Sequence, residues 1–226
     1  FRYYFGRVLF QAAQGYPAQP GGNPAEVLLV DVNDDRRQDL IVAHQSSDRI
    51  GVLLGNGDGT FQPMVLYTAV PGGVRIASAD LDRDGSVDLV ISGFNNGQIG
   101  LLFGKGDGTF RTGAPLTVGS RPVGVVALDL SGDGLADLVR IRNGEVCYWP
   151  NLGYGRFGAK VGMDNAPHFD NPDQFDPKRL RLADIDAHSA PARAARILVH
   201  LLGDDLGPEL LGRAPIGVGE RLILGM

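Results

Sequence analysis

The sequence predicts an all-β fold, a β-propeller built from four-stranded blades of about 50 residues. Two repeated motifs lead to this fold class. An acidic loop begins at Asp31 and returns 49 residues later at Asp80. A Gly-Asp-Gly-Thr-Phe turn ends at Phe61 and returns 49 residues later at Phe110. A third, variant copy of each motif follows. Fixed periods of this length are typical of stacked or radially arranged supersecondary units.

Each unit is expected to contain four short strands that are rich in Val, Ile and Leu. In the second unit they cover residues 74–79, 88–92, 98–103 and 110–118. The acidic loop follows the first strand and the Gly-rich turn follows the third. Gly, Asn, Asp and Pro separate the strands, as they do in β-hairpins. No sustained helical period occurs before Asp186, so four antiparallel strands per unit indicate a propeller blade.

The acidic loops carry oxygen side chains at positions 1, 3, 5 and 9, which is the pattern that a hard cation such as calcium needs. A helical EF-hand is excluded, because position 12 is Val42, Ile91 or Arg140 instead of Glu and the flanking segments are β-like. The candidate side-chain ligands in the three loops are Asp31, Asn33, Asp35 and Asp39, then Asp80, Asp82, Asp84 and Asp88, then Asp129, Ser131, Asp133 and Asp137.

We expect a structural calcium ion that pins each loop between its strands. Clustered carboxylates repel one another, so a bound cation contributes directly to folding. A ligand bridged through the metal and a loss of metal binding are the two alternatives. Asp58 and Asp107 lie between glycines in the turns, where we expect a turn role and not a second metal site.

Composition narrows the function classes. The chain has 226 residues and a formal net charge of −5, and it shows no basic stripe of the kind that binds nucleic acid. No apolar run approaches the ~18 residues needed to cross a bilayer. Cys147 is the single cysteine, so no internal disulfide can form, and its strand-like surroundings predict a buried thiol. The chain begins with Phe1 and not with Met, so we expect its start to be missing, and a signal peptide would not be visible.

The sequence offers little support for catalysis, and we expect a non-enzymatic protein. His44 and His168 have no partner at zinc-site or triad spacing, and we expect His44 to be an exposed residue at a strand end. Neither an HExxH nor a G-x-S-x-G motif occurs. Paired carboxylates also serve glycoside hydrolases, but the calcium spacing already accounts for them here.

The paired loop and turn motifs resemble the FG-GAP/VCBS family of integrin-α-like propeller repeats, over about residues 10–186. This resemblance implies calcium, with a backbone carbonyl at position 7 as a further ligand: Arg37, Ser86 and Leu135. Arg36 stands where the family has Gly, a position that often needs positive φ. Propellers of this family commonly have about seven blades. The chain is therefore expected to hold about four units, as a fragment of a larger propeller, a smaller closed ring or an open array.

A second resemblance covers residues 145–186, including Tyr148-Trp149-Pro150-Asn151 and a Pro-, Asn- and Asp-rich run. This segment is similar to the N-terminal region of SpvB-type proteins and of toxin-complex B components. In those families the propeller belongs to a large secreted assembly. The resemblance implies a structural role in a toxin-delivery shell as an alternative function.

Two regions are expected along the chain. Residues 1–186 form the repeats and residues 187–226 form a divergent tail. The expected repeat units lie near 10–60, 61–109, 110–156 and 157–186. A fourth loop opens at Asp184 but has Ala192 at position 9, so no fourth metal is expected. The tail has no aromatic residue; we expect poor order, from a frameshift or from divergence, with a helix or a last strand at 193–202 as an alternative.

The leading functional expectation is a calcium-stabilised binding or scaffolding module for a protein or glycan ligand. An extracellular or secreted location is expected, because chains that rely on calcium instead of disulfides are common outside bacterial cells. The core should lie between blades and should include Leu40, Leu89, Leu138, Phe61, Phe110 and Phe157.

Overall fold

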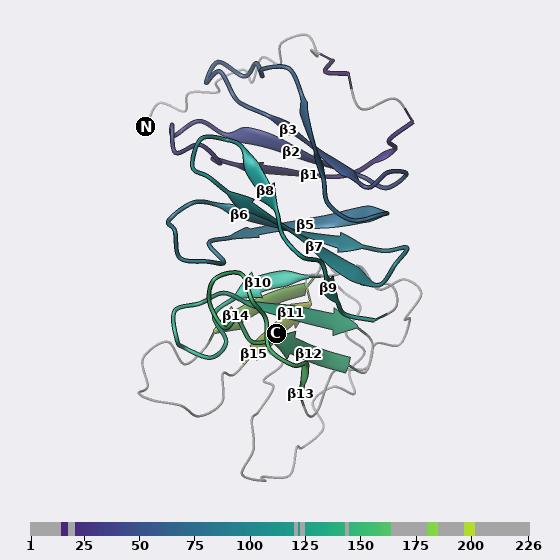
Figure 1. The fold of residues 1–226 in the computed structure, drawn as a ribbon, viewed down its shortest axis with the longest axis vertical. Helices are drawn as coiled ribbons and strands as arrows, with labels where there is room; N and C mark the ends of the chain where they lie inside the picture. The colour runs from purple at the N-terminus through teal and green to yellow at the C-terminus, as the bar shows by residue number, and fades with distance from the viewer. Residues whose placement is uncertain are drawn as a thin grey trace, which may run out of the picture.

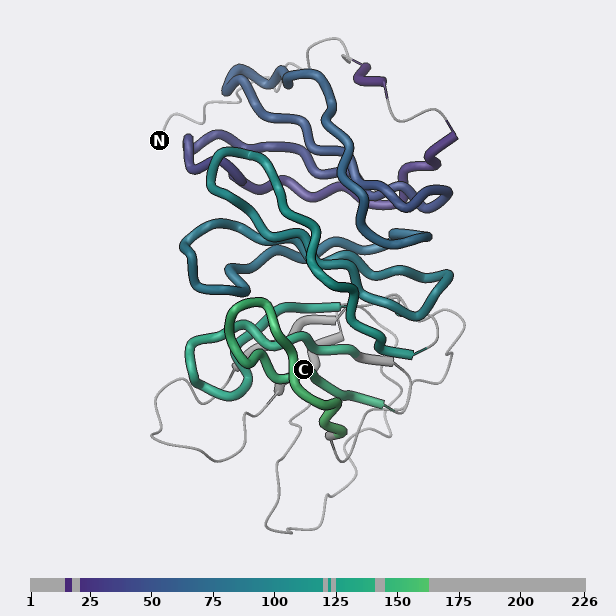
Figure 2. Tube along the Cα trace, viewed as in Figure 1, coloured from purple at the N-terminus to yellow at the C-terminus, as the bar shows by residue number. Residues whose placement is uncertain are grey.

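The computed structural model shows an all-β protein, as the sequence predicts (Figure 1). Three antiparallel sheets of four or five strands are stacked along the long axis, and the chain passes through them in sequence order (Figure 2). The described part contains no helix that is long and apolar enough to span a membrane. The residues described are 15–17, 21–119, 122, 125–142, 145–163, 180–184 and 197–201.

The first sheet has the strand order β1-β2-β3-β4. Its strands are β1 (Pro24–Val30), β2 (Asp39–His44), β3 (Arg49–Leu53) and β4 (Val65–Thr68). The acidic loop joins β1 to β2 and the Gly-rich turn joins β3 to β4. Both connections therefore lie at the same end of the strands, because adjacent strands are antiparallel.

The second sheet repeats this order with β5 (Gly73–Ala79), β6 (Asp88–Gly93), β7 (Gln98–Gly104) and β8 (Phe110–Thr112). A short fifth strand, β9 (Leu116–Thr117), also pairs with β7. The expected strand at 110–118 is thus divided in two. A Gly-Ala-Pro sequence interrupts it, and Pro has no N–H with which to extend the ladder.

The third sheet contains β10 (Val126–Leu128), β11 (Asp137–Arg142), β12 (Glu145–Trp149) and β13 (Val161–Met163). Its order is again sequential, β10-β11-β12-β13. The repetition of one topology over three successive sheets is what a series of propeller blades requires.

The sheets are offset from the expected repeat units. The unit boundary at 60/61 falls between β3 and β4 and the boundary at 109/110 falls immediately before β8, yet β4 pairs with β3 and β8 pairs with β7. The Gly-rich turn is therefore a hairpin inside one sheet and does not mark the passage to the next. That passage occurs after β4 and after β9.

A fourth, two-stranded sheet pairs β14 (Leu180–Asp184) with β15 (Ile197–Leu201). The alternatives expected for residues 193–202 are a helix and a last strand, and the part of this range that the structure describes is the strand β15. The fourth loop beyond Asp184, and the question of its metal, lie outside the described residues. So do the inserted segment at 164–179 and most of the tail.

Two apolar cores separate the three sheets. Leu89 and Ile91 of β6 face the first sheet, whereas Val90 between them faces the third sheet. On β7 the alternation continues, with Leu102 in the first core and Leu101 in the second. The middle sheet is thus buried on both faces, which explains why its strands are continuous apolar runs and not alternating ones.

The expected core is confirmed in part. Three of its residues are buried: Leu89, Leu138 and Phe110. Three are only half-buried: Leu40, Phe61 and Phe157. Phe61 lies at the sheet margin, where the Tyr16 ring meets it edge-on at a centroid distance of 5.4 Å. Phe157 packs against the second core from its rim.

The expectation of an exposed His44 is wrong, because this side chain is fully buried. The pairing of β1 with β2 extends to the pair Pro24–His44, so the histidine lies within the ladder and not beyond it. Burial lowers its pKa, and a hydrogen bond with the Arg49 backbone opposes this shift only in part. The expected burial of Cys147 is confirmed, and burial raises the pKa of its thiol.

Leu102→Ala tests the packing of the middle sheet against the first sheet. Leu102 is fully buried between two sheets, so its truncation should lower the free energy of unfolding by about 2–5 kcal/mol. Leu29→Ala is the matched control, because 55% of that side chain is exposed and its loss should change stability by less than about 1 kcal/mol. Urea denaturation of both variants measures the difference. Equal losses of stability in the two variants contradict the proposed packing.

Candidate metal-binding loops

A buried aspartate closes each acidic loop at position 9. In the second loop, Asp88 Oδ2 accepts the N–H of Leu81 at 2.7 Å and Oδ1 accepts the N–H of Gly104 at 2.8 Å. The first bond closes the loop, and the second ties it to the turn after β7. The same pair of bonds recurs for Asp39 with Val32 and Gly55, and for Asp137 with Leu130 and Asn151.

The aspartate at position 1 shapes the loop from its other end. Asp80 accepts the N–H groups of Arg83 at 2.7 Å and of Gly85 at 3.0 Å. The N–H of position 6 makes the equivalent bond in all three loops, including Arg36 to Asp31 at 2.6 Å. Side-chain acceptors thus satisfy the backbone donors of a loop that has no ladder partner.

Position 6 adopts positive φ in every copy of the loop. Gly85 and Gly134 have φ of 87° and 81°, and Arg36 has φ of 64°. Glycine takes this conformation without strain, whereas an L-residue in it is destabilised by roughly 1–2 kcal/mol. The first loop therefore keeps the geometry of the other two at some loss of stability.

The aspartate at position 5 orients the residue that is expected to offer a carbonyl ligand. Asp84 Oδ1 accepts the N–H of Ser86 at 2.7 Å. The same bond joins Asp35 to Arg37 and Asp133 to Leu135. All three loops therefore share one backbone course through position 7.

One group of carboxylates converges closely enough to hold a cation within the described part of the chain. Ligand oxygens of Asp80, Asp82 and Asp88 lie within 4.8 Å of one another. Oδ1 of Asp82 is buried and has no hydrogen bond of normal geometry, although the backbone N–H of Asp84 approaches this carboxylate and lowers its pKa. A buried carboxylate oxygen without such a bond is unfavourable, and a cation would satisfy it. The residues of the second loop therefore fit a metal ion, although Asp84 does not belong to the convergent group.

The pKa shifts of Asp82 and Asp88 also indicate that these carboxylates would be stabilised by a cation. Burial, opposed by the N–H groups of Leu81 and Gly104, raises the pKa of Asp88 to about 6. Burial, together with the negative charge of Asp84, also raises the pKa of Asp82. Both shifts mean that the charged carboxylates are less favourable here than in water.

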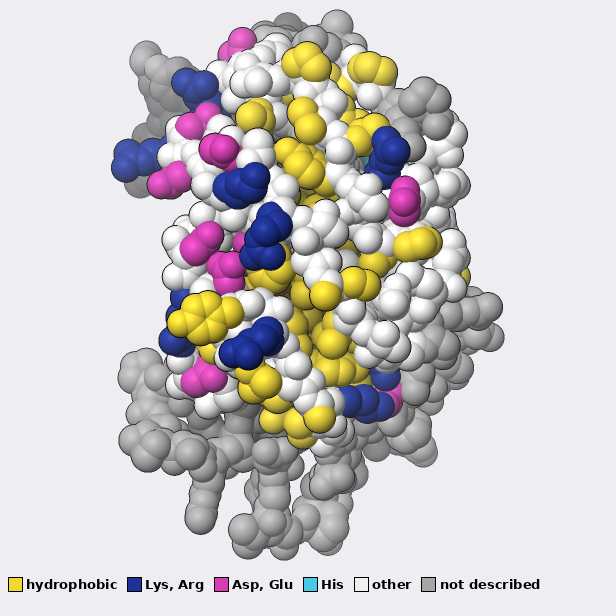
Figure 3. Space-filling view, viewed as in Figure 1, with side chains coloured by type: hydrophobic (Ala, Val, Ile, Leu, Met, Phe, Trp, Pro, Cys, Tyr) yellow, Lys and Arg dark blue, Asp and Glu magenta, His cyan; other side chains and the backbone are white. Residues whose placement is uncertain are grey.

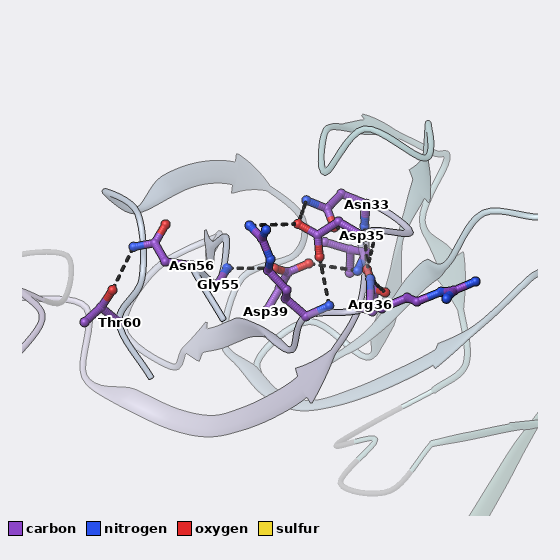
Figure 4. A network of polar contacts seen from close by, with 10 residues as sticks. Asn33, Asp35, Arg36, Asp39, Gly55, Asn56 and Thr60 are labelled. Carbon is purple, nitrogen blue, oxygen red and sulfur yellow. Dashed lines mark hydrogen bonds and ion pairs between the residues drawn. The ribbon is translucent and has the colours of Figure 1, made fainter. Parts of the chain in front are cut away.

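The first and third loops bring fewer charges together. In the first loop the Asn33 amide donates to Asp35 Oδ2 at 3.1 Å, within the network around Asp39 and Gly55 (Figure 4). In the third loop Ser131 is exposed and its N–H donates to Asp137 at 3.1 Å. Position 3 is neutral in both loops. Among positions 1, 3 and 9, which converge in the second loop, the first and third loops therefore have two carboxylates and the second loop has three.

The first glycine of the Gly-rich turn is required by its close approach to the loop. A Cβ atom on Gly104 would lie 2.3 Å from the carbonyl oxygen of Val87, and one on Gly55 would lie 2.2 Å from that of Gln38. These distances are far inside van der Waals contact. Only glycine brings its N–H to the buried carboxylate here without displacing the backbone.

The third unit is two residues shorter than the other two between the aspartate at position 9 and the turn phenylalanine, yet its turn has the same length. Asn151 pairs with Phe157 as Gly55 pairs with Phe61, so Asn151 occupies the glycine position. The missing residues come from the hairpin between β11 and β12. The Asn151 amide donates to the carbonyl of Ala136 at 3.0 Å, which turns the close approach into a hydrogen bond.

The aspartates of the first two turns act within the turns. Asp58 Oδ1 accepts the N–H and the hydroxyl of Thr60 at 2.9 and 2.6 Å, and Asp107 does the same with Thr109. The Thr60 hydroxyl lowers the pKa of Asp58, as that of Thr109 does for Asp107. Tyr154 replaces the aspartate in the third turn and is exposed.

Residues 31–91 and 80–140 each match the FG-GAP-like repeat family, and the two matches are offset by the same 49 residues as the loops. Residues 31–140 are FG-GAP-like repeats. The two matches overlap because each includes two acidic loops and the turn between them.

The solved structures that resemble the chain include two different proteins. One is a lectin from Agrocybe aegerita, described for its specific recognition of non-reducing terminal N-acetylglucosamine (TM-score 0.49, 21% identity). The other is TcdB2-TccC3 (TM-score 0.29, 18% identity). The matches cover 71% and 74% of this chain, but only 42% of the lectin chain and 11% of the TcdB2-TccC3 chain. No curated protein matches the sequence.

Two arginines next to the FG-GAP-like loops were not found by sequence reasoning. Arg83 Nε donates to the Gly134 carbonyl at 3.4 Å and so connects the second loop to the third. Arg111 Nη2 lies 3.6 Å from Asp82 Oδ2. Charged side chains of both signs gather along one edge of the stack (Figure 3). No local motif marks these arginines, because their partners are distant in sequence.

Gly104→Ala tests the contact between turn and loop. The added Cβ must displace the backbone at Val87, so the free energy of unfolding should fall by about 1–3 kcal/mol or more. Gly162→Ala is the matched control, because a Cβ there meets no atom within 4 Å. Thermal denaturation compares the two. A Gly104→Ala variant as stable as Gly162→Ala contradicts the close approach.

Proposed function

We propose that this chain is a calcium-stabilised, non-enzymatic binding or scaffolding module that acts outside the cell. The observation that carries the proposal is the second loop, where Asp80, Asp82 and Asp88 converge around a buried oxygen without a hydrogen bond of normal geometry. The FG-GAP-like repeats supply the framework, since the same loop occurs in each successive sheet.

Calcium in the second loop would be held by the side chains of Asp80, Asp82, Asp84 and Asp88 and by the carbonyl of Ser86. Its charge would offset the repulsion among the carboxylates, and this would stabilise the folded state. Oδ1 and Oδ2 of Asp88 each accept one N–H, and each keeps a second lone pair for a cation. The third and first loops follow in expected affinity, because their position 3 is neutral.

A non-enzymatic role agrees with how the reactive residue types are used. His44 and Cys147 are fully buried in strands, away from any substrate. The loop carboxylates at positions 1, 5 and 9 are engaged with backbone N–H groups. These residues account for the structure of the loops without any reaction.

A binding role is supported by exposed apolar side chains at the tip of the third turn. Leu152 is 58% exposed and Tyr154 is 85% exposed, and Tyr154 has φ of 54°. An exposed aromatic side chain in a sparsely populated backbone conformation is typical of a contact site. A glycan array and a protein-capture experiment, each with the native chain and Tyr154→Ala, test this role. Unchanged or absent binding to every ligand argues against it.

A structural part in a secreted toxin-complex shell is the second candidate. It rests on the resemblance of residues 145–186 to SpvB-type and toxin-complex B sequences. The coding sequence downstream distinguishes the two candidates. Rhs-type repeats indicate a shell, whereas a cell-wall anchor or a second adhesive module indicates an adhesin.

Calcium should stabilise the chain measurably. With a dissociation constant of roughly 10⁻⁴–10⁻³ M, about 10 mM calcium should add about 1.4–2.7 kcal/mol to the free energy of unfolding. Asp82→Asn should lose most of this gain. In chelator its stability should stay close to that of the native chain, because the lost contact with Arg111 is offset by weaker repulsion from Asp80 and Asp84.

Melting curves in calcium and in EDTA measure this effect. Asp48→Asn is the control: it removes one exposed carboxylate away from the loops and should keep the full calcium response. If the native chain melts at the same temperature in calcium and in EDTA, the proposed calcium dependence is wrong.

A further inference from the structure

Arg111 lies beside the convergent carboxylates of the second loop. It follows the turn phenylalanine at the start of β8, and its Nη2 is 3.6 Å from Asp82 Oδ2. Its guanidinium carbon also lies 4.4 Å from the centroid of the Phe103 ring. The Asp82 side chain is 16% exposed, whereas that of Arg111 is 59% exposed. The arginine therefore approaches a largely buried carboxylate from the solvent side.

The other repeats have no cation at this position, although in the first loop Arg37 Nη1 lies 3.9 Å from Asp35 Oδ2. The residue after the turn phenylalanine is Gln62 in the first unit and Gly158 in the third. The neighbouring Arg83 does not replace it, because its guanidinium is directed to the Gly134 carbonyl in the next loop. The loop with the most carboxylates is thus the one that has an arginine beside position 3.

We propose that Arg111 is a built-in counter-cation that sets the calcium affinity of the second loop. This inference rests on the proposed calcium function and concerns its regulation. Without calcium, the guanidinium offsets part of the negative charge around Asp82. With calcium, the same positive charge lies close to the ion and weakens its binding.

Elementary electrostatics gives the size of the effect. A unit charge about 6 Å from a divalent cation, in a water-like dielectric, changes the binding constant roughly tenfold. Salt at physiological concentration screens part of this interaction, because the Debye length is about 8 Å. The expected range is therefore a threefold to tenfold change in affinity. Contact with Phe103 keeps the guanidinium near the loop in both states.

Arg111→Gln tests the inference, since Gln is the residue that the first unit has at this position. The calcium dissociation constant, measured by isothermal titration calorimetry, should fall threefold to tenfold. The melting temperature in EDTA should fall, while the rise on adding calcium should become larger. This opposite effect on the two states separates a counter-cation from a residue that only packs.

Two further variants identify the cause. Arg111→Lys keeps the charge and should keep the native affinity. Arg49→Gln removes an exposed arginine that pairs with Asp48 at 4.0 Å, away from the loop, and should leave calcium binding unchanged. A lower dissociation constant in either variant, comparable to that of Arg111→Gln, overturns the inference, because charge at position 111 is then not the cause.

The remaining outcomes distinguish this inference from the proposed function. If the native chain and Arg111→Gln bind calcium equally, the counter-cation role is wrong and the calcium function stands. If neither chain binds calcium, both are wrong. If binding is detected in Arg111→Gln and is much weaker in the native chain, both are supported.

Discussion

The buried carboxylate at position 9 is the interaction on which each sheet depends. Asp39, Asp88 and Asp137 are fully buried, and each accepts at least one N–H from its own loop and one from the turn that follows the third strand. One side chain thus joins two connections that lie far apart in sequence. The close approach also explains why glycine begins two of the turns, and why the third unit needs an asparagine that hydrogen-bonds to the carbonyl it meets.

Burying this charge has a consequence for the rest of the loop. Two N–H donors stabilise the Asp88 carboxylate, yet its pKa still rises to about 6, so burial outweighs the hydrogen bonds. The loop then places Asp80 and Asp82 beside it, which increases the negative charge further. Such a cluster requires a positive partner, and the second loop has Arg111 as one and the proposed calcium as another.

Packing between sheets makes the units interdependent. The middle sheet is covered on both faces, so its strands contribute to two cores, and each core takes residues from neighbouring sheets only. Stability in such an array is close to a sum of nearest-neighbour terms. Polar residues interrupt the apolar pattern at His44 and at Arg140, whose guanidinium pairs with Glu145 at 2.8 Å and lies over the Trp149 ring. The repeats are therefore alike in topology and individual in their contacts.

The sequence by itself determined the repeat length, most of the strands, the acidic loops and the Gly-rich turns, because each depends on local periodicity and on residues close together in the chain. It could not show the burial of His44, the partial exposure of Leu40, or the alignment of the third turn through Asn151. Nor could it show Arg111 beside Asp82. These features were decided by the tertiary structure. They depend on how far the pairing of two strands extends along the chain, and on which side chain from a distant segment lies beside a given residue.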